Sequence, residues 1–276
     1  MNTQLRRDLI LATAYEQGHV DVKSLDRRMD ISEATVRRDL RLLAEEHLLE
    51  LVYGGATLPR NSDFSFRAKS QRNIEAKRTI GRLAADLVAD NDQIFIDSGT
   101  TTFEMCPYLR PRRSLSVIVN SARLAVELGG LPQIDVIVLG GQYRNDRSDM
   151  VGPLALSTLE QLRGYQAFIG ADGLALDFGV TASDIDSAHL YRLAIRHARE
   201  VILLVDHTKL QAPSLYKITE FDSIARVVTD EPPPAEWSRF FTEQQIDVIH
   251  PGCAGVNGKQ VASAASARMA DDMIDG

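Results

Sequence analysis

The 276-residue chain lacks any run of 18 apolar residues, and its first residues show no signal-peptide pattern. We therefore expect a cytoplasmic protein that makes no contact with a membrane. Only two cysteines occur, Cys106 and Cys253, and they lie far apart in sequence. That scarcity argues against a disulfide framework and a cysteine-rich metal site. The six histidines also lack ligand spacing, so we expect no metal and no cofactor.

An excess of positive charge is missing too. The formal net charge is −7, and residues 1–60 contain nine basic and ten acidic side chains. The basic residues of this segment are nevertheless clustered: Arg6, Arg7, Lys23, Arg27, Arg28, Arg37, Arg38 and Arg41. Because the local field at a groove matters more than the total charge, salt-sensitive binding to nucleic acid remains possible.

Residues 32–43 are predicted to form a helix with two different faces. At 100° per residue, Val36, Leu40 and Leu43 share one face, and three arginines project from the opposite face. Ser32 precedes the helix and is a suitable N-cap. Such a helix can pack on a small core and present cations to the DNA major groove.

The flanking segments predict the rest of a winged helix-turn-helix domain. Residues 4–17 and 21–29 have the spacing of two amphipathic helices, the first ended by Gly18. The pattern places Leu5, Leu9, Ala12 and Tyr15 on the inner side of the first helix, and Val22, Leu25 and Met29 on that of the second. Residues 48–53 and 56–58 flank Gly54-Gly55, which is typical of a β-hairpin and would form the wing.

An arginine-rich helix face alone is more often solvated than bound to DNA. Two preceding helices, a tight turn and the hairpin together favour DNA contact. We expect the contacts to come from the third helix and the wing: Ser32, Glu33, Thr35, Arg37, Arg38, Arg41, Tyr53, Gly54 and Gly55.

The remainder of the chain predicts a larger, Rossmann-like α/β domain. Apolar, β-branched runs alternate with helical patterns, which indicates a mainly parallel sheet covered on both faces. The runs lie at residues 93–97, 115–119, 134–139, 167–170, 201–206, 226–229 and 246–249. Helical patterns lie at residues 73–89, 102–109, 121–128, 154–162, 188–198 and 234–245. The predicted organisation is a DNA-binding domain at 1–58, a linker at 59–73, an effector domain at 74–252 and a tail at 253–276.

Ligands of such sheets bind at the carboxyl ends of strands. The segment from Asp97 to Thr101 follows a strand and opens a helix, with hydroxyls and a glycine suited to a phosphate. Similar segments follow the other strands, and the complete set expected to bind an effector is Asp97, Ser98, Gly99, Thr100, Thr101, Asn120, Ser121, Gly140, Gly141, Arg147, Asp172 and Lys209. The alternatives are an ordinary capped turn at Gly99, a surface lysine at Lys209, a turn-forming Asp172 and a solvated Arg147. The same alternative, a solvated arginine, applies to Arg144.

Several motifs resemble the DeoR family of bacterial transcriptional regulators, which includes glycerol-3-phosphate repressors. The first two are Ser32-x-x-Thr35-Val36-Arg37-Arg38-Asp39-Leu40 and Tyr53-Gly54-Gly55-Ala56. The others are Phe95-Ile96-Asp97-Ser98-Gly99-Thr100-Thr101, Gly140-Gly141, Ile169-Gly170-Ala171-Asp172-Gly173 and Asp206-His207-Thr208-Lys209.

The resemblance implies an effector domain similar to ribose-5-phosphate isomerase that senses phosphorylated sugars. It further implies a repressor of a carbohydrate-catabolism operon that binds double-stranded operator DNA, and we expect a homodimer or homotetramer. Residues 181–186 depart from the segment common in relatives, so the sugar does not follow from the resemblance.

Two other functions stay open at this point. One is a sugar-phosphate isomerase, for which Asp184, Asp186 and Glu200 offer carboxylates, although the Lys-Gly-Gly-Gly segment of that enzyme is missing. The other is a DNA-binding protein without an effector. We expect no catalytic residues, and we hypothesise that closure of the Gly99 and Lys209 loops tilts the helix near Ile74 and so alters operator binding.

Overall fold

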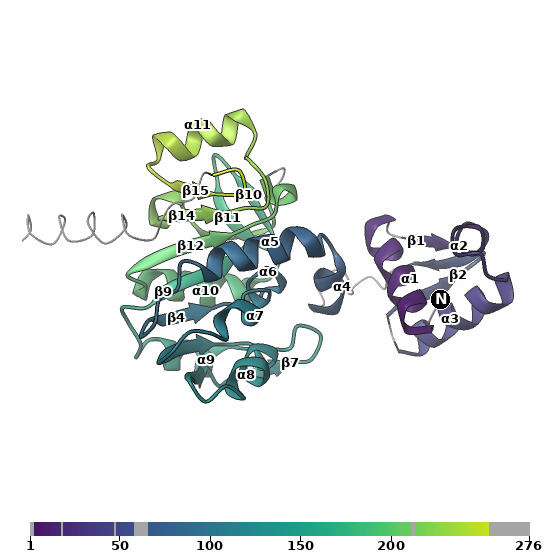
Figure 1. Cartoon of the computed structure of the whole chain (residues 1–276), viewed down its shortest axis with the longest axis horizontal. Coiled ribbons are helices and arrows are strands. Elements are labelled where there is room, and N and C mark those ends of the chain that lie inside the picture. The colour runs from purple at the N-terminus through teal and green to yellow at the C-terminus, as the bar shows by residue number, and fades with distance from the viewer. Residues whose placement is uncertain (1–2, 18, 47, 58–65, 211–212, 254–276) are drawn as a thin grey trace, which may run out of the picture.

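The computed structural model describes residues 3–17, 19–46, 48–57, 66–210 and 213–253, in two domains (Figure 1). The N-domain (residues 3–57) contains helices α1 (Thr3–Gln17), α2 (Val22–Met29) and α3 (Glu33–Glu45). Its strands are β1 (His19–Asp21), β2 (Glu50–Val52) and β3 (Gly55–Thr57), paired antiparallel in the order β1-β3-β2. The predicted winged helix-turn-helix fold is confirmed.

Local capping fixes the turn between α2 and α3. Asp21 caps α2 by accepting a hydrogen bond from the Ser24 backbone N–H at 2.9 Å. Asp30 ends α2 with a left-handed φ of 52°, and the Ser32 hydroxyl then accepts from the Thr35 N–H at 3.3 Å. The predicted cap at Ser32 is therefore confirmed.

The inner face of α1 differs from the prediction. Leu5 and Leu9 are 58% and 37% exposed, whereas the buried α1 side chains include Ile10, Leu11 and Ala14. Ion pairs contribute to this orientation of α1, because Arg6 and Arg7 both reach Asp39 of α3. The face formed by residues 6, 7, 10, 11 and 14 therefore points inward. The side chain of Tyr15, and Gly18, lie outside the described residues.

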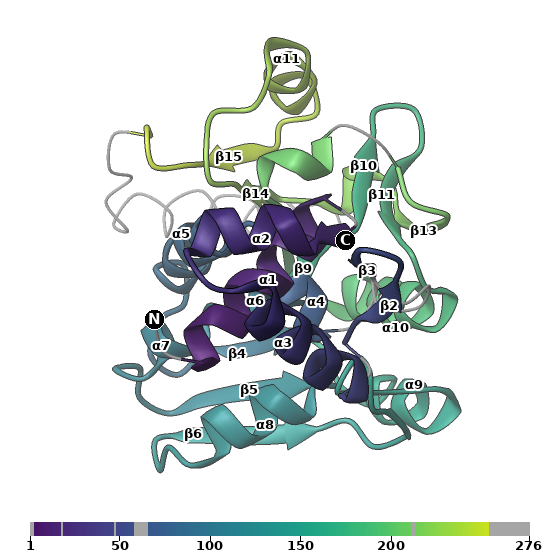
Figure 2. The same cartoon turned by 90° about the vertical axis from the view of Figure 1, so that its right-hand side faces the viewer.

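The C-domain (residues 66–253) is built on a seven-stranded parallel sheet, as predicted. Its order is β15-β14-β12-β9-β4-β5-β6, and Figure 2 shows β4, β5 and β6 following one another toward one edge. The strands are β4 (Gln93–Ile96), β5 (Leu115–Val119), β6 (Ile134–Val138), β9 (Gln166–Gly170), β12 (Glu200–Leu204), β14 (Arg226–Val228) and β15 (Asp247–Ile249).

Helices cover both faces of this sheet. They are α4 (Phe66–Gln71), α5 (Ile74–Ala85), α6 (Thr100–Phe103), α7 (Cys106–Leu109), α8 (Ala122–Gly129), α9 (Pro153–Leu159), α10 (Ile185–His197) and α11 (Ala235–Glu243). Side chains alternate along β4, so that Phe95 packs in a core with α9, α10 and α11, and Ile94 and Ile96 pack in a second core with α5, α7 and α8. None of the described helices is long and apolar enough to cross a membrane.

Small elements complete the domain. A ribbon pairs β7 (Gln142–Arg144) with β8 (Asp149–Val151), and an antiparallel sheet joins β10 (Gly173–Ala175), β11 (Gly179–Ala182) and β13 (Tyr216–Thr219). Two 3₁₀ turns, η2 (His207–Leu210) and η3 (Phe221–Ser223), follow β12 and β13.

Three segments depart from the sequence-based expectation. The predicted helix at 102–109 is divided into α6 and α7, and the one at 73–89 ends at Ala85. Part of the predicted linker forms α4, where Phe66 is buried edge-on against Phe103 at 5.4 Å with Arg123 over its ring at 4.7 Å. Residues 66–73 are thus built into the C-domain, while residues 59–65 lie outside the described part.

Candidate DNA interface and effector cavity

The exposed face of α3 carries the predicted arginines. Val36, Leu40 and Leu43 are buried in the N-domain core, as expected from the helical period. Arg37, Arg38 and Arg41 are exposed on the other side. Arg37 lies 3.1 Å from Glu33 one turn earlier, so this cation is partly balanced within the helix.

Not every cation of the cluster faces solvent. Asp39 is 2% exposed, and its carboxylate accepts from Arg6 Nε at 2.5 Å and from Arg7 Nε at 3.3 Å. These two arginines therefore join α1 to α3. Arg28 donates to the Thr13 hydroxyl at 3.3 Å but stays exposed. The exposed positive charge of the N-domain is therefore smaller than the sequence indicates.

The wing exposes a tyrosine and depends on two glycines. Tyr53 is fully exposed at the tip between β2 and β3. Gly54 has a φ of +82°, and a Cβ on Gly55 would lie 1.9 Å from the Val20 carbonyl oxygen on β1. Both glycines thus serve the backbone of the wing. Among the other predicted contacts, Ser32 is exposed and Thr35 is half-buried, with their hydroxyls 3.0 Å apart.

The C-domain has a cavity of about 240 Å³ at the carboxyl ends of β4, β9 and β12. From β4 the chain proceeds through β5 and β6 to one edge, and from β9 through β12, β14 and β15 to the other. The cavity lies where this direction reverses, which is the usual ligand site of open parallel sheets. Cations line it at Lys69, Arg72, Lys77, Arg147 and Lys209, and carboxylates at Asp97, Asp149, Asp172 and Asp206.

Asp97 joins the loops that follow β4 and β9. It is 1% exposed and accepts from the N–H groups of Gly99 at 2.9 Å and Gly170 at 2.7 Å, and from the Thr102 hydroxyl. Burial raises the pKa of Asp97, and these three hydrogen bonds oppose that rise. Its role in the geometry is to hold the backbone around Gly99.

A second carboxylate network lies beside the cavity and contributes Asp149 and Ser187 to its lining. Arg144 donates to Asp149 at 2.7 Å, to Asp184 at 2.7 Å and to the Ser187 hydroxyl at 2.9 Å. Burial would raise the pKa of Asp184, but Arg144 and the Ser187 donors outweigh it and lower that pKa to about 2. Arg144 is therefore a partly buried structural cation, in contrast to the solvated residue the sequence suggested.

Lys77 is the most buried cation of the cavity, at 4% exposed. Burial lowers its pKa to about 8, and Lys209 and Lys69 act in the same direction, against the opposing field of Asp206. Its ammonium donates to the backbone carbonyl of Lys69. A buried ammonium with a lowered pKa beside other cations gains most from a nearby anion, because the anion stabilises the charged form.

The structure brings together eight of the predicted effector residues: Asp97, Ser98, Gly99, Thr100, Thr101, Arg147, Asp172 and Lys209 all line the cavity. The other four do not line it. Asn120 donates to the Met150 carbonyl at 3.2 Å, and Ser121 caps α8 through the Leu124 N–H at 3.3 Å. Gly141 has a φ of +134°, and a Cβ added to it would lie 2.5 Å from the Val151 carbonyl oxygen. Gly140 precedes it in the same loop.

Sequence reasoning missed the cations that come from before β4. Lys69 and Arg72, with the neutral Asn73, line the cavity from the segment interpreted as a linker, which had no periodicity to reveal them. Lys77 did carry a signal, because it lies at i−3 from Ile80 and i−7 from Ala84 on the inner face of α5. A lysine on an apolar helix face is an early indication of a buried site.

The carboxylates considered for isomerase chemistry lie elsewhere. Asp184 caps α10 and pairs with Arg144, and Asp186 is exposed in the first turn of that helix. Glu200 begins β12, at the end of the strand opposite the cavity, and pairs with Arg226. None of the three lines the cavity.

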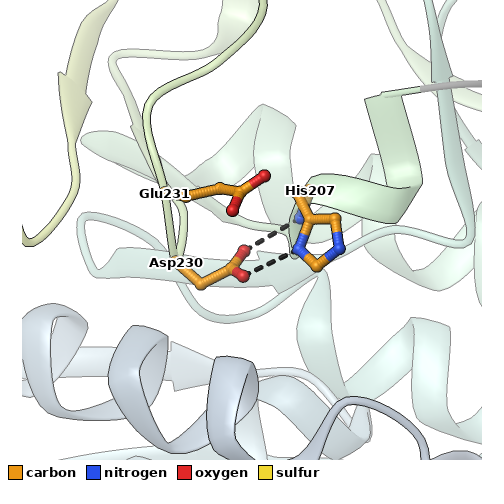
Figure 3. Close-up of side chains that lie close together, drawn as sticks. All are labelled: His207, Asp230 and Glu231. Carbon is orange, nitrogen blue, oxygen red and sulfur yellow. Dashed lines mark hydrogen bonds and ion pairs between the residues drawn. The ribbon is translucent and has the colours of Figure 1, made fainter.

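A histidine braces the loop that carries Lys209. The backbone N–H of His207 lies 2.9 Å from one Asp230 oxygen, and its Nδ1 lies 2.8 Å from the other (Figure 3). The hydrogen bond that the His207 ring donates to Asp230 raises the pKa of His207. Glu231 is a third residue of a type that can ligate a metal, and the ligand atoms of the three residues lie within 4.8 Å of one another. Because both Asp230 oxygens already bind His207, the cluster acts as a brace between η2 and the end of β14.

Known families match both domains. Residues 6–62 match the DeoR-like helix-turn-helix domain, and residues 72–231 match the DeoR C terminal sensor domain. Among solved structures, ribose 5-phosphate isomerase A from Methanocaldococcus jannaschii aligns with a TM-score of 0.37 at 19% identity, covering 50% of this chain and 55% of that one. The fold assignment rests on the strand order above and not on that likeness.

Curated relatives extend over nearly the whole chain. The HTH-type transcriptional repressor CsqR of Escherichia coli (strain K12) is 32% identical over 89% of this chain and 95% of its own length. The HTH-type transcriptional regulator IolR of Bacillus subtilis (strain 168) is 30% identical over 84% and 92%. The glycerol-3-phosphate regulon repressor of Escherichia coli (strain K12) is 27% identical over 90% and 99%. The chain belongs to the DeoR family of DNA-binding transcriptional regulators.

Proposed function

We propose that this regulator represses a carbohydrate-catabolism operon and that a phosphorylated sugar bound in the C-domain cavity changes its affinity for operator DNA. The observation that carries the proposal is the lining of one cavity by five cations together with hydroxyls of Ser98, Thr100 and Thr101. Cations and hydroxyls are the groups that bind a phosphoryl oxygen. The relatives include a repressor named for glycerol 3-phosphate, which supports the same ligand class.

The size of the cavity favours a small ligand. A volume of about 240 Å³ suits a short phosphorylated sugar better than a nucleotide or a disaccharide. Lys77, at the buried end, and Lys209, on η2, are two of the cations we assign to the phosphoryl group. Asn73 and Thr208 offer neutral donors and acceptors for sugar hydroxyls.

The DNA-binding part of the proposal uses α3 and the wing. Arg38 and Arg41 would enter or flank the major groove, and Tyr53 would contact the backbone beside it. Operators of winged-helix proteins generally contain two half-sites, so we propose a homodimer or a homotetramer. Light scattering of the purified chain distinguishes these from a monomer.

A ligand screen tests the effector. We expect one or more members of a panel of phosphorylated trioses, pentoses and hexoses, with glycerol 3-phosphate included, to raise the melting temperature by mass action. The matched control is the same panel without phosphate groups. Calorimetry on Lys77→Met should show lost binding, whereas Lys217→Met, on β13 away from the cavity, should bind normally.

The same samples separate the alternatives. Conversion of a bound sugar phosphate to its isomer would support an enzyme and contradict the proposal. If no phosphorylated compound binds, the effector half fails and the chain is a DNA-binding protein of another kind.

A further inference from the structure

Helix α4 touches both the cavity and the N-domain. It begins nine residues after Thr57, the end of β3, and contacts α1. In Figure 1 it lies on the side of the C-domain that faces the N-domain. A movement of α4 would therefore alter its contact with α1 of the N-domain.

The inner side of α4 is fastened by an ion pair across the cavity. Lys69 Nζ lies 2.5 Å from Asp172 Oδ1, and the other Asp172 oxygen accepts from the N–H and hydroxyl of Ser183, at 2.8 and 2.7 Å. Asp172 follows β9, so this pair joins α4 directly to the end of a central strand. Both partners are about one quarter exposed and line the cavity, where an entering anion can reach Lys69.

The outer side of α4 contacts the C-terminal end of α3, the helix with the exposed arginines. Arg67 Nη1 lies 3.7 Å from Glu46 Oε2, and Glu46 is the C-cap of α3. Both side chains are more than two-fifths exposed, so the contact is weak and easily lost. A weak contact is suited to a switch, because a small displacement of α4 breaks it.

We propose that α4 transmits occupancy of the cavity to α3: a phosphoryl group takes Lys69 away from Asp172, α4 shifts, and the Arg67–Glu46 contact changes. This inference rests on the proposed function, since it assigns the regulation of the same cavity. The phosphoryl group and Asp172 compete for one ammonium, so the ligand has different affinities for the two positions of α4. That difference is what an allosteric ligand requires.

The first experiment needs no ligand. Asp172→Asn keeps an acceptor for Ser183 but removes the charge that holds Lys69, and Lys69→Gln breaks the same pair from the α4 side. Each should change the affinity for a DNA duplex, selected from a random pool by the wild-type protein, by about threefold or more. Amide hydrogen exchange of residues 66–71 should accelerate in both. The matched control is Gln71→Ala, on the exposed end of α4 outside the cavity lining, which should leave both measurements unchanged.

The second experiment uses the phosphorylated sugar found in the screen. It should change wild-type DNA affinity in the same direction as Asp172→Asn. Arg67→Ala should keep the calorimetric affinity for the sugar but lose most of the change in DNA affinity that the sugar causes. The control is Arg110→Ala, in an exposed pair with Glu127 on the C-domain, which should retain that change.

The outcomes separate the two claims. If Asp172→Asn and Lys69→Gln bind DNA as the wild type does, with unchanged exchange at 66–71, the α4 mechanism is wrong even when a sugar phosphate binds. A full DNA response in Arg67→Ala contradicts the last step. If no phosphorylated sugar binds, the proposed function fails, and the ligand-free variants still decide whether α4 controls α3.

Discussion

At the scale of single residues, the structure separates the buried from the exposed arginines around α3. Arg6 and Arg7 hold the buried Asp39, whereas Arg38 and Arg41 project into solvent. The sequence alone cannot make that distinction, because all four are arginines within one basic cluster. The helical period did predict which apolar residues of α3 are buried, since Val36, Leu40 and Leu43 recur on one face.

The first prediction concerns these exposed arginines. Arg38→Ala and Arg41→Ala should each weaken binding to the selected duplex by about tenfold, because each removes a charge-assisted contact with phosphate or base. An arginine on phosphate also contributes about one unit to the salt dependence of binding, so the slope should fall. Fluorescence anisotropy at several salt concentrations measures both quantities. Arg110→Ala is the control; equal losses in all three variants would point to a general charge effect.

The second prediction concerns the buried Lys77. Its pKa of about 8 leaves it charged at pH 7 and mostly neutral at pH 9. A sugar phosphate is already dianionic at both pH values. Its affinity should therefore fall about tenfold between pH 7 and pH 9. Calorimetry at the two pH values tests this, and Lys77→Arg, which stays charged, should remove the fall. A flat profile in the wild type would show that Lys77 does not meet the anion.

At the scale of elements, the η2 turn depends on the His207–Asp230 brace. The hydrogen bond with Asp230 raises the pKa of His207 above that of the unfolded chain. Its contribution to stability is therefore fully present below the unfolded pKa, near 6.5, and is lost as pH rises through the folded value.

The third prediction concerns the stability that His207 loses as the pH rises. Because His207 is 39% exposed, the loss should stay below about 1 kcal/mol. The melting temperature should fall slightly between pH 6 and pH 8.5, and Asp230→Asn should flatten this part of the curve. The same slope in wild type and variant would mean that another group titrates.

The fourth prediction concerns the glycine that follows β6. Alanine at Gly141 would have a strained φ of +134° and a Cβ 2.5 Å from the Val151 carbonyl. Gly141→Ala should therefore lower the free energy of unfolding of the C-domain by about 1–3 kcal/mol. Gly129→Ala is the control, because Gly129 ends α8 in open space and should be neutral or slightly stabilising. Denaturant unfolding measures both, and equal stability of the two variants would contradict the argument.

The strands of the main sheet were predictable, and the smaller elements were not. The seven strands were evident from their apolar, β-branched runs, five of which are followed by a helical pattern. The elements of the β10-β11-β13 sheet, the β7-β8 ribbon and α4 are three to six residues long and lack such a β-branched apolar run. Long-range contacts decide them, such as the hydrogen bond from Phe66 N–H to the Asp146 carbonyl at 2.9 Å.

At the scale of the whole molecule, the position of the cavity could be predicted and its full lining could not. The alternation of strands and helices locates a ligand at the carboxyl ends of the strands, and the residues at 97–101, 172 and 209 meet there. Asn120 and Gly141 also follow strands, but those strands lie beyond the point where the chain direction reverses. Lys69 and Arg72 reach the cavity because α4 packs against α6 of the C-domain, and Lys77 reaches it from the inner face of α5.

The two domains form one regulator only if ligand and DNA affect each other. Thermodynamic linkage requires that the factor by which a sugar phosphate changes DNA affinity equal the factor by which DNA changes sugar-phosphate affinity. The most direct test is to titrate the selected duplex into the full chain with and without saturating sugar phosphate. We predict DNA affinities that differ by about fivefold or more. Identical affinities in the two titrations, with the ligand shown to be bound, would contradict the account.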